Sequence, residues 1–374
     1  MTFRDTIKAA LHYEPYDKLP VVSFGYWAET VHKWADEGHI TREEAEDYCR
    51  SGDNGSGDRS IMKKLGFDFN WNSCVGAACD LFPRFEEKVL ETHADGSQVI
   101  RDSSGLIVMV KPGVVSIPAE IGTSLTGRKV WEEEYLPRLK FSMDRINQKA
   151  LEALKDDTNR DLPIGIHCGS LVGTMRNLLG VEQFSYLIAD DFDLYLEIID
   201  AMDTLCYDCV KAMLDTGAKF DYGHFWEDIC FKNGPLMVPA MFDKYVGPHY
   251  KKITSLLNQH GVDIVSVDCD GCIDRLIPTW LANGVNTMFP IEVGTWNASI
   301  APWREQYGKE LRGVGGMNKT VFARDYKAVD EEVEHLRRLI ELGGYIPCPD
   351  HRIAPDAKFE NVQYYCDKMQ NLKL

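Results

Sequence analysis

The chain has 374 residues, of which 44% are hydrophobic and 11% aromatic, which is sufficient for a large packed core. Its formal net charge of −17 disfavours binding to nucleic acid and to anionic membranes, because both depend on a basic protein surface. The N-terminus has no signal-peptide pattern, and no apolar stretch approaches the roughly 20 residues that span a bilayer. We therefore expect a cytoplasmic protein whose eleven cysteines are reduced.

Short apolar runs that alternate with helical segments predict an α/β fold with a parallel sheet. The N-terminal region is predicted to be largely helical, and residues 51–57 have the composition of a loop. The predicted strands contain Val21, Phe69, Ile164, Tyr222, Ile264, Met288, Val314 and Ile346. Eight such strands close a (β/α)8 TIM barrel, so we predict that residues 1–374 form a single barrel domain.

Residues 85–118 depart from this alternation. Apolar runs on either side of turns at residues 94–97 and 103–105 predict an antiparallel β-hairpin region inserted into the barrel. This insertion can cover the mouth of the barrel or form a small separate domain. Further along the chain, one helix is predicted from an apolar face with helical spacing, formed by Val329, Val333, Leu336, Leu339 and Ile340.

Polar residues gather where the predicted strands end, which is the position of the active site in (β/α)8 barrels. Asp268 and Asp270 follow the strand at Ile264, although an aspartate there can also cap the next helix. His351 follows the last strand in a loop made rigid by two prolines. Glu292 is a lone carboxylate in an apolar context, and its partner is a metal, a substrate or a salt bridge to Arg304 or Lys319.

A second group of candidates follows the strand at Tyr222. Glu227 and Asp228 are adjacent carboxylates, and since neighbouring side chains diverge on an extended backbone, we expect one of them to face the site. Either can act as a catalytic acid, as can Asp270. The predicted substrate-binding residues are aromatic or histidine side chains near strand ends, namely Tyr222, Trp226, His167 and Phe289.

The mixture of carboxylate and imidazole groups predicts a site for Zn²⁺ or another divalent metal. Its expected ligands are Asp268, Asp270, Glu292 and His351. Cys269 and Cys272 form a CxxC pair, but the chain has no second CxxC that would complete a four-thiolate zinc site.

These motifs together resemble the uroporphyrinogen decarboxylase superfamily, whose members are (β/α)8 barrels. The resemblance covers most of the chain and is densest in Gly234–Pro239, Asp268–Gly271, Phe289–Glu292, Gly343–Pro347 and Asp350–His351. The true decarboxylases carry an Arg-rich segment near the N-terminus that binds the carboxylates of the tetrapyrrole. Residues 21–28 stand in its place and contain no arginine, which argues against uroporphyrinogen as the substrate.

The resemblance is closer in character to the cobalamin-dependent methyltransferase branch. Those enzymes hold zinc with a His-x-Cys pair and a later cysteine, and the matching positions here are Asp268, Asp270 and His351. This harder ligand set favours an oxygen-bearing substrate. The resemblance thus implies an O-demethylase, a methyltransferase that takes the methyl group from a small O-methyl compound, such as a methoxylated aromatic, and passes it to a corrinoid protein.

The alternative reading is a metal-free decarboxylase acting on a smaller acid, with Asp268 or Asp270 as the proton donor. A third is a ligand-binding barrel without chemistry. The expected partners are a corrinoid protein and a small-molecule methyl donor. The oligomeric state is left open, with a homodimer as the option considered.

Overall fold

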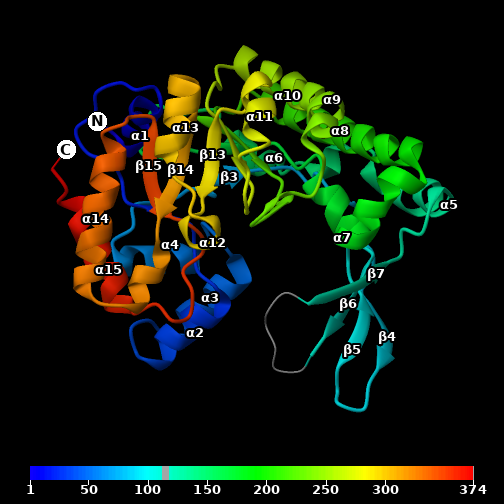
Figure 1. Ribbon diagram of the computed structural model, residues 1–374, viewed down its shortest axis with the longest axis horizontal. Helices are drawn as coiled ribbons and strands as arrows, with labels where there is room; N and C mark the ends of the chain where they lie inside the picture. The colour runs from blue at the N-terminus through cyan, green and yellow to red at the C-terminus, as the bar shows by residue number, and fades with distance from the viewer. Residues whose placement is uncertain (112–117, 374) are drawn as a thin grey trace.

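The computed structural model describes residues 1–111 and 118–373, and its centre is a parallel sheet (Figure 1). Seven strands follow the order β15-β14-β13-β12-β9-β8-β3, and every neighbouring pair is parallel. Their bounds are β3 (Cys74–Val75), β8 (Gly165–His167), β9 (Tyr222–Trp226), β12 (Val265–Asp268), β13 (Thr287–Ile291), β14 (Arg312–Met317) and β15 (Tyr345–Pro349). These strands are mostly buried on both faces, as in parallel sheets covered by helices.

Two further parallel strands, β1 (Val22–Ser23) and β2 (Phe69–Asn70), pair with each other. Strand β1 packs against β15, and a parallel bridge joins Tyr26 to Ile353 just beyond them. Each of the eight predicted runs contains or adjoins a strand, which confirms the α/β class, whereas β3 was not predicted. Among the described residues, the hydrogen-bonded ladders keep β1 and β2 in a sheet separate from the seven-stranded sheet and do not form a closed barrel.

Helices cover the central sheet and fill the N-terminal region (Figure 1). Helix α14 (Tyr326–Ile340) begins at the N-cap Asp325, and the five apolar residues predicted to form its inner face are all buried. The other N-terminal and central helices are α1 (Phe3–Leu11), α2 (Ala28–Asp36), α3 (Arg42–Ser51), α4 (Ser56–Leu65), α5 (Arg128–Val130), α6 (Gln148–Glu152), α7 (Gly173–Asp190) and α8 (Phe192–Asp215). The remaining helices are α9 (Pro239–Tyr245), α10 (Gly247–Gln259), α11 (Ile277–Ala282), α12 (Val293–Trp296), α13 (Ile300–Tyr307) and α15 (Phe359–Gln370).

The predicted insertion is an antiparallel sheet that projects from the body of the molecule (Figure 1). Its strands pair in sequence order and are β4 (Lys88–Thr92), β5 (Gln98–Arg101), β6 (Leu106–Val110) and β7 (Ala119–Thr123). Strand β7 pairs with β6 and lies beyond residue 118, where the sequence places the end of the inserted region. Residues 112–117 of the predicted region lie outside the described part of the chain.

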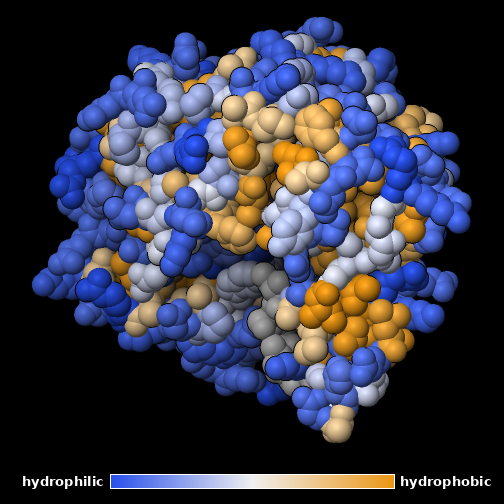
Figure 2. Space-filling view, turned by 45° about the vertical axis from the view of Figure 1, so that its right-hand side comes forward, coloured by the Kyte–Doolittle hydropathy of each residue, from blue (hydrophilic) through white to orange (hydrophobic). Residues whose placement is uncertain are grey.

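The surface of this projecting sheet carries apolar side chains (Figure 2). Val89, Leu90 and Ile121 are exposed on its two outer strands. Within residues 1–111 and 118–373, no helix is long and apolar enough to cross a membrane.

Candidate active site

A large cleft lies between the projecting sheet and the carboxyl ends of β8 and β9. Its volume is about 1140 Å³, and its lining includes Ile100 and Val108 from the insertion and His167, Trp226 and Asp228 from the strand ends. Catalytic side chains in barrel-type α/β folds come from the carboxyl ends of strands. The cleft is therefore the place where a small molecule can reach three of the residues that the sequence singled out.

The adjacent carboxylates Glu227 and Asp228 point to different surroundings, as the sequence predicted for such a pair. Glu227 is fully buried and accepts hydrogen bonds from the backbone N–H groups of residues 171–173, at 2.8–2.9 Å. The hydroxyl of Tyr250 also donates to it, at 2.5 Å. Glu227 thus holds the loop between β8 and α7, and the side chain of this pair that lines the cleft is Asp228.

Asp228 has a backbone φ of 46°, a left-handed conformation that is costly for a residue other than glycine. Its carboxylate accepts a hydrogen bond from Nη2 of Arg176 at 3.1 Å. Burial raises the pKa of Asp228, the Arg176 charge lowers it, and the nearby Asp270 carboxylate raises it. The strained turn places this carboxylate between the cleft and the acidic side chains that follow β12.

Asp268 ends β12 and is 8% exposed. Burial raises its pKa well above the usual range for aspartate, and the carboxylates of Asp270 and Asp228 add to that effect. Like charges that share a poorly solvated site cannot all ionise, so one of them keeps its proton. These effects favour the protonated form of Asp268, and the charge of Arg352 opposes them.

His351 lies in the loop after β15 and contacts the same group. Its Nε2 is 3.2 Å from Oδ2 of Asp270. The imidazole ring stacks on Trp27, with ring centroids 5.4 Å apart, and meets the ring of Phe24 edge-on. Two aromatic neighbours and one carboxylate therefore fix both the position and the orientation of the histidine.

Glu292 is 5% exposed, and its hydrogen-bond partners among the described residues are not Arg304 or Lys319, the salt-bridge partners considered from the sequence. Instead it accepts hydrogen bonds from the Gly271 N–H at 2.5 Å and from the Thr295 hydroxyl at 2.8 Å. Burial and the Asp270 charge raise its pKa. Glu292 thus holds the loop that carries Asp270, and its oxygens are occupied by protein donors.

The four predicted metal ligands, Asp268, Asp270, Glu292 and His351, do not fit a metal ion as they are arranged. Among the described residues, no three His, Cys, Asp or Glu side chains form a group that could hold one. Asp270 and His351 contact each other, and Glu292 binds a backbone N–H. We therefore derive no chemistry through a metal, and elemental analysis of wild-type and His351→Ala protein tests the metal prediction directly.

The four predicted substrate-binding residues fall into two groups. His167 and Trp226 line the cleft, whereas Tyr222 and Phe289 are buried in the centre of the sheet. Tyr222 donates to the Trp71 carbonyl at 2.7 Å, and Phe289 packs against other aromatic rings. Burial lowers the pKa of His167 to about 4, so its imidazole is neutral near pH 7.

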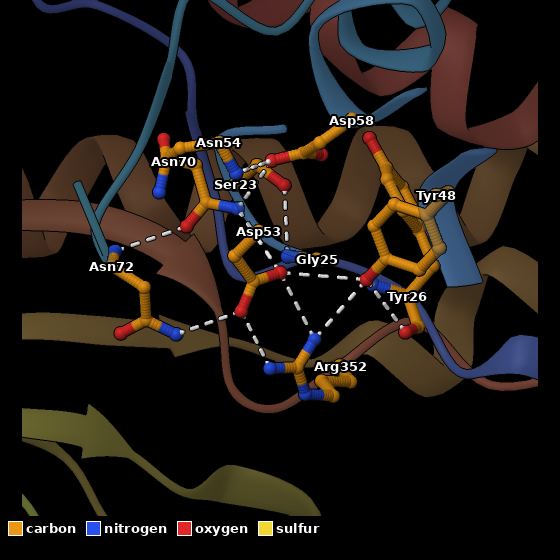
Figure 3. A network of polar contacts seen from close by, with 10 residues as sticks. All are labelled: Ser23, Gly25, Tyr26, Tyr48, Asp53, Asn54, Asp58, Asn70, Asn72 and Arg352. Atoms are coloured by element: carbon orange, nitrogen blue, oxygen red, sulfur yellow. Dashed lines mark hydrogen bonds and ion pairs between the residues drawn. The ribbon is translucent and has the colours of Figure 1, made fainter. Parts of the chain in front are cut away.

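Sequence reasoning did not identify two arginines that reach the site. Arg176 projects from α7 into the cleft, and its guanidinium carbon lies 5.9 Å from the ring centroid of Trp226. Arg352, next to His351, forms an ion pair with Asp53 and belongs to the polar network of Figure 3. No local motif marked either arginine, because each meets its partner only through the fold.

The network of Figure 3 joins the N-terminal region to the His351 loop. Asp58 is fully buried, accepts hydrogen bonds from Asn54 N–H at 2.7 Å and from Asn70 Nδ2 at 2.9 Å, and leaves Oδ1 without a partner among the described residues. Burial raises the pKa of Asp58 to about 6.

Gly25 lies where a Cβ would come within 2.5–2.9 Å of Asp53, Arg352 and Tyr48, so the network needs glycine at this position.

Solved structures are similar to this chain to different degrees. A methyltransferase from Methanosarcina mazei matches 99% of this chain and 98% of its own, with a TM-score of 0.62 at 19% sequence identity. A B12-independent methionine synthase from a Shewanella species, in complex with selenomethionine, matches 94% of this chain and 97% of its own, with a TM-score of 0.45 at 10% identity. The first likeness shows a shared fold, and no curated protein sequence matches the chain.

The amino-acid sequence assigns the chain to a family, which the structural likeness does not. A sequence model of the uroporphyrinogen decarboxylase family matches residues 132–372, which include every central strand from β8 to β15 and the candidate acidic residues from Glu227 to Glu292. The match covers more than half of the chain, and the chain belongs to the uroporphyrinogen decarboxylase family.

Proposed function

We propose that this protein is an enzyme that transfers a methyl group from a small O-methyl compound, such as a methoxylated aromatic, to a corrinoid protein. The family and the shared fold with a methyltransferase support the reaction class. The absence of arginine from residues 21–28 argues against uroporphyrinogen as the substrate. The observation that carries the proposal is the buried carboxyl of Asp268, whose pKa is raised by burial and by its acidic neighbours.

A neutral carboxylic acid can lower the barrier to demethylation of an ether. When the O–CH3 bond breaks, its electron pair stays on oxygen, and a proton donated by Asp268 yields the neutral alcohol or phenol. The reduced corrinoid of the partner protein supplies the nucleophile that accepts the methyl group. Asp270, oriented by His351, keeps a second carboxylate beside Asp268 and so favours the protonated form of the donor.

We also propose that the two sheets complete a (β/α)8 barrel. The contact between β1 and β15 and the bridge between Tyr26 and Ile353 support closure on one side. On the other side, β2 and β3 are separated by only a short turn, residues 71–73, and together they count as one of the eight strands. A closed barrel brings the ends of β1, β9, β12 and β15 to one rim, where an acid and a histidine can act on one substrate.

The transfer reaction is the direct test. Purified protein is incubated with a reduced corrinoid protein and a panel of methyl ethers, and methylcobalamin is followed by its absorbance. We expect turnover with at least one ether, and a large loss of kcat in Asp268→Asn. Asp263→Asn is the matched control, because Asp263 lies just before the same strand, at its amino end, and its side chain is 58% exposed. No methylcobalamin with any ether would contradict the proposal.

A metal-free decarboxylase is the second candidate, and the same neutral acid favours it. Asp268 can protonate the carbanion that remains when carbon dioxide leaves an acidic substrate. Release of carbon dioxide without corrinoid, lost in Asp268→Asn, would select this reaction over methyl transfer.

A further inference from the structure

Arg176 lines the cleft with hydrogen-bonding capacity that the protein does not use. Its side chain is 16% exposed, and Nη2 donates to Asn177 Oδ1 at 2.9 Å and to Asp228 Oδ2 at 3.1 Å. Within the described residues, Nη1 has no protein acceptor, and Nε is buried without a hydrogen-bond partner. Nη1 therefore keeps free N–H donors, and an oxygen of a ligand in the cleft can accept hydrogen bonds from them.

Most other charged groups of the cleft have protein partners, and Glu87, which has none among the described residues, carries acceptors and no donor when ionised. Arg84 forms an ion pair with Asp80. Asp102 accepts hydrogen bonds from the turn that precedes β6, and Glu120 accepts one from a backbone N–H in α7. Arg176 is therefore the positively charged side chain of this cleft that still has N–H groups without a protein acceptor.

The surroundings of Arg176 suit a ring with a charged substituent. Beside the guanidinium lies the ring of Trp226, and much of the remaining wall is apolar. This wall includes Ala77, Leu81, Phe82, Ile100, Leu106 and Val108. A small-molecule site of this kind combines an apolar lining with a few polar groups that fix the orientation of the ligand.

We propose that Arg176 binds a carboxylate of the substrate, so that the cleft selects methoxylated aromatic acids over uncharged methoxylated aromatics. The guanidinium is planar and forms hydrogen bonds with carboxylates in a fixed geometry. The methoxylated ring in this inference rests on the proposed function, whereas the carboxylate site rests on the contacts of Arg176. Asp228 holds one edge of the guanidinium and thereby orients the remaining donors.

Binding of two matched ligands tests the proposal. Calorimetric titration compares 4-methoxybenzoate with 4-methoxybenzamide, which has the same shape and no charge. A charge-assisted hydrogen bond predicts that wild-type protein binds the acid about tenfold to a hundredfold more tightly than the amide. Arg176→Gln should lower the affinity for the acid to that for the amide and leave amide binding unchanged. Arg176→Lys should give an intermediate preference, because it keeps the charge and loses the planar fork.

Arg84→Gln is the matched control, because Arg84 also lines the cleft but is paired with Asp80, and it should keep the wild-type preference. Equal affinities in wild-type protein, or a preference retained in Arg176→Gln, would overturn the proposal. Loss of amide binding in Arg176→Gln would also overturn the proposal, because it would show that the arginine maintains the structure of the cleft and does not bind the carboxylate.

The titration contains no corrinoid, so it separates this inference from the proposed function. Preference for the acid without methyl transfer would keep the carboxylate site and reject the methyltransferase. Methyl transfer from acids and amides at equal rates would keep the methyltransferase and reject the carboxylate site.

Discussion

Arg352 donates to both carboxylate oxygens of Asp53, from Nη1 to Oδ1 at 3.0 Å and from Nη2 to Oδ2 at 2.6 Å (Figure 3). Asp53 follows helix α3 of the N-terminal region, and Arg352 follows His351. This bidentate pair therefore connects the N-terminal helices to the loop that carries the candidate histidine. Stacking of Trp27 on His351 reinforces the same connection.

Removing one partner of this pair should destabilise the protein. Asp53→Ala leaves the Arg352 charge partly buried without its carboxylate, and we expect the free energy of unfolding to fall by about 1–3 kcal/mol. Asp36→Ala is the control, because its ion pair with Arg42 is exposed and should contribute less than about 1 kcal/mol. Urea unfolding measures both, and equal losses in the two variants would contradict the predicted role of the pair.

Asp58 should make stability depend on pH. Its pKa in the folded protein is about 6, against a model-compound value of 3.8. Between these values the folded protein holds a proton that the unfolded chain has lost, so the free energy of unfolding falls as pH rises through the window. The total change is about 3 kcal/mol for a shift of roughly two units.

Asp58→Asn should flatten that dependence, because an amide does not titrate. Urea unfolding of both proteins at a series of pH values from about 4 to 7 provides the measurement. As pH rises, the free energy of unfolding of the variant should increase relative to that of the wild type. Parallel curves for the two proteins would show that other groups dominate this pH range.

Asp268 should control the pH dependence of turnover. Because burial and acidic neighbours raise its pKa, an enzyme that uses it as an acid loses activity as pH rises through that pKa. Asp268→Asn should lower kcat by about 10²–10⁴-fold and remove the fall at high pH. A variant with wild-type kcat, or with an unchanged alkaline limb in its pH profile, would exclude Asp268 as the proton donor.

The neighbours Glu227 and Asp228 should respond to substitution in opposite ways. Glu227→Ala leaves the buried N–H groups of residues 171–173 without their acceptor, and we expect a loss of stability of at least about 2 kcal/mol. Asp228→Ala should change stability far less and chiefly affect turnover, because its side chain lines the cleft. Thermal unfolding and steady-state kinetics of the two variants measure both effects, and a reversed pattern would exchange the two roles.

Much of the fold was predictable because it depends on local patterns. Alternating apolar runs located the eight predicted strands, and turn residues located the insertion before residue 118. Strand β7 escaped prediction because residues 119–123 have no clear alternation and become a strand by pairing with β6. The two-residue strand β3 depends likewise on its pairing with β8.

The candidate site was predictable in part. The ends of strands are local features, so Asp268, Asp270 and His351 could be expected to face one rim. In the structure, Asp270 and His351 are in contact although they lie 81 residues apart in the sequence. Arg176 and Arg352 could not be found in this way, because one extends from a helix and the other has its partner, Asp53, 299 residues away.

The sequence by itself determined the α/β class, the order of the strands along the chain and the resemblance to its family, since these follow from periodicity and motifs of adjacent residues. Tertiary structure alone decided which of Glu227 and Asp228 faces the cleft, and which groups donate hydrogen bonds to the buried carboxylate of Glu292. These outcomes depend on which backbone N–H groups and charges the fold brings within hydrogen-bonding distance. A buried carboxylate takes its role from those neighbours, and they lie far away in the chain.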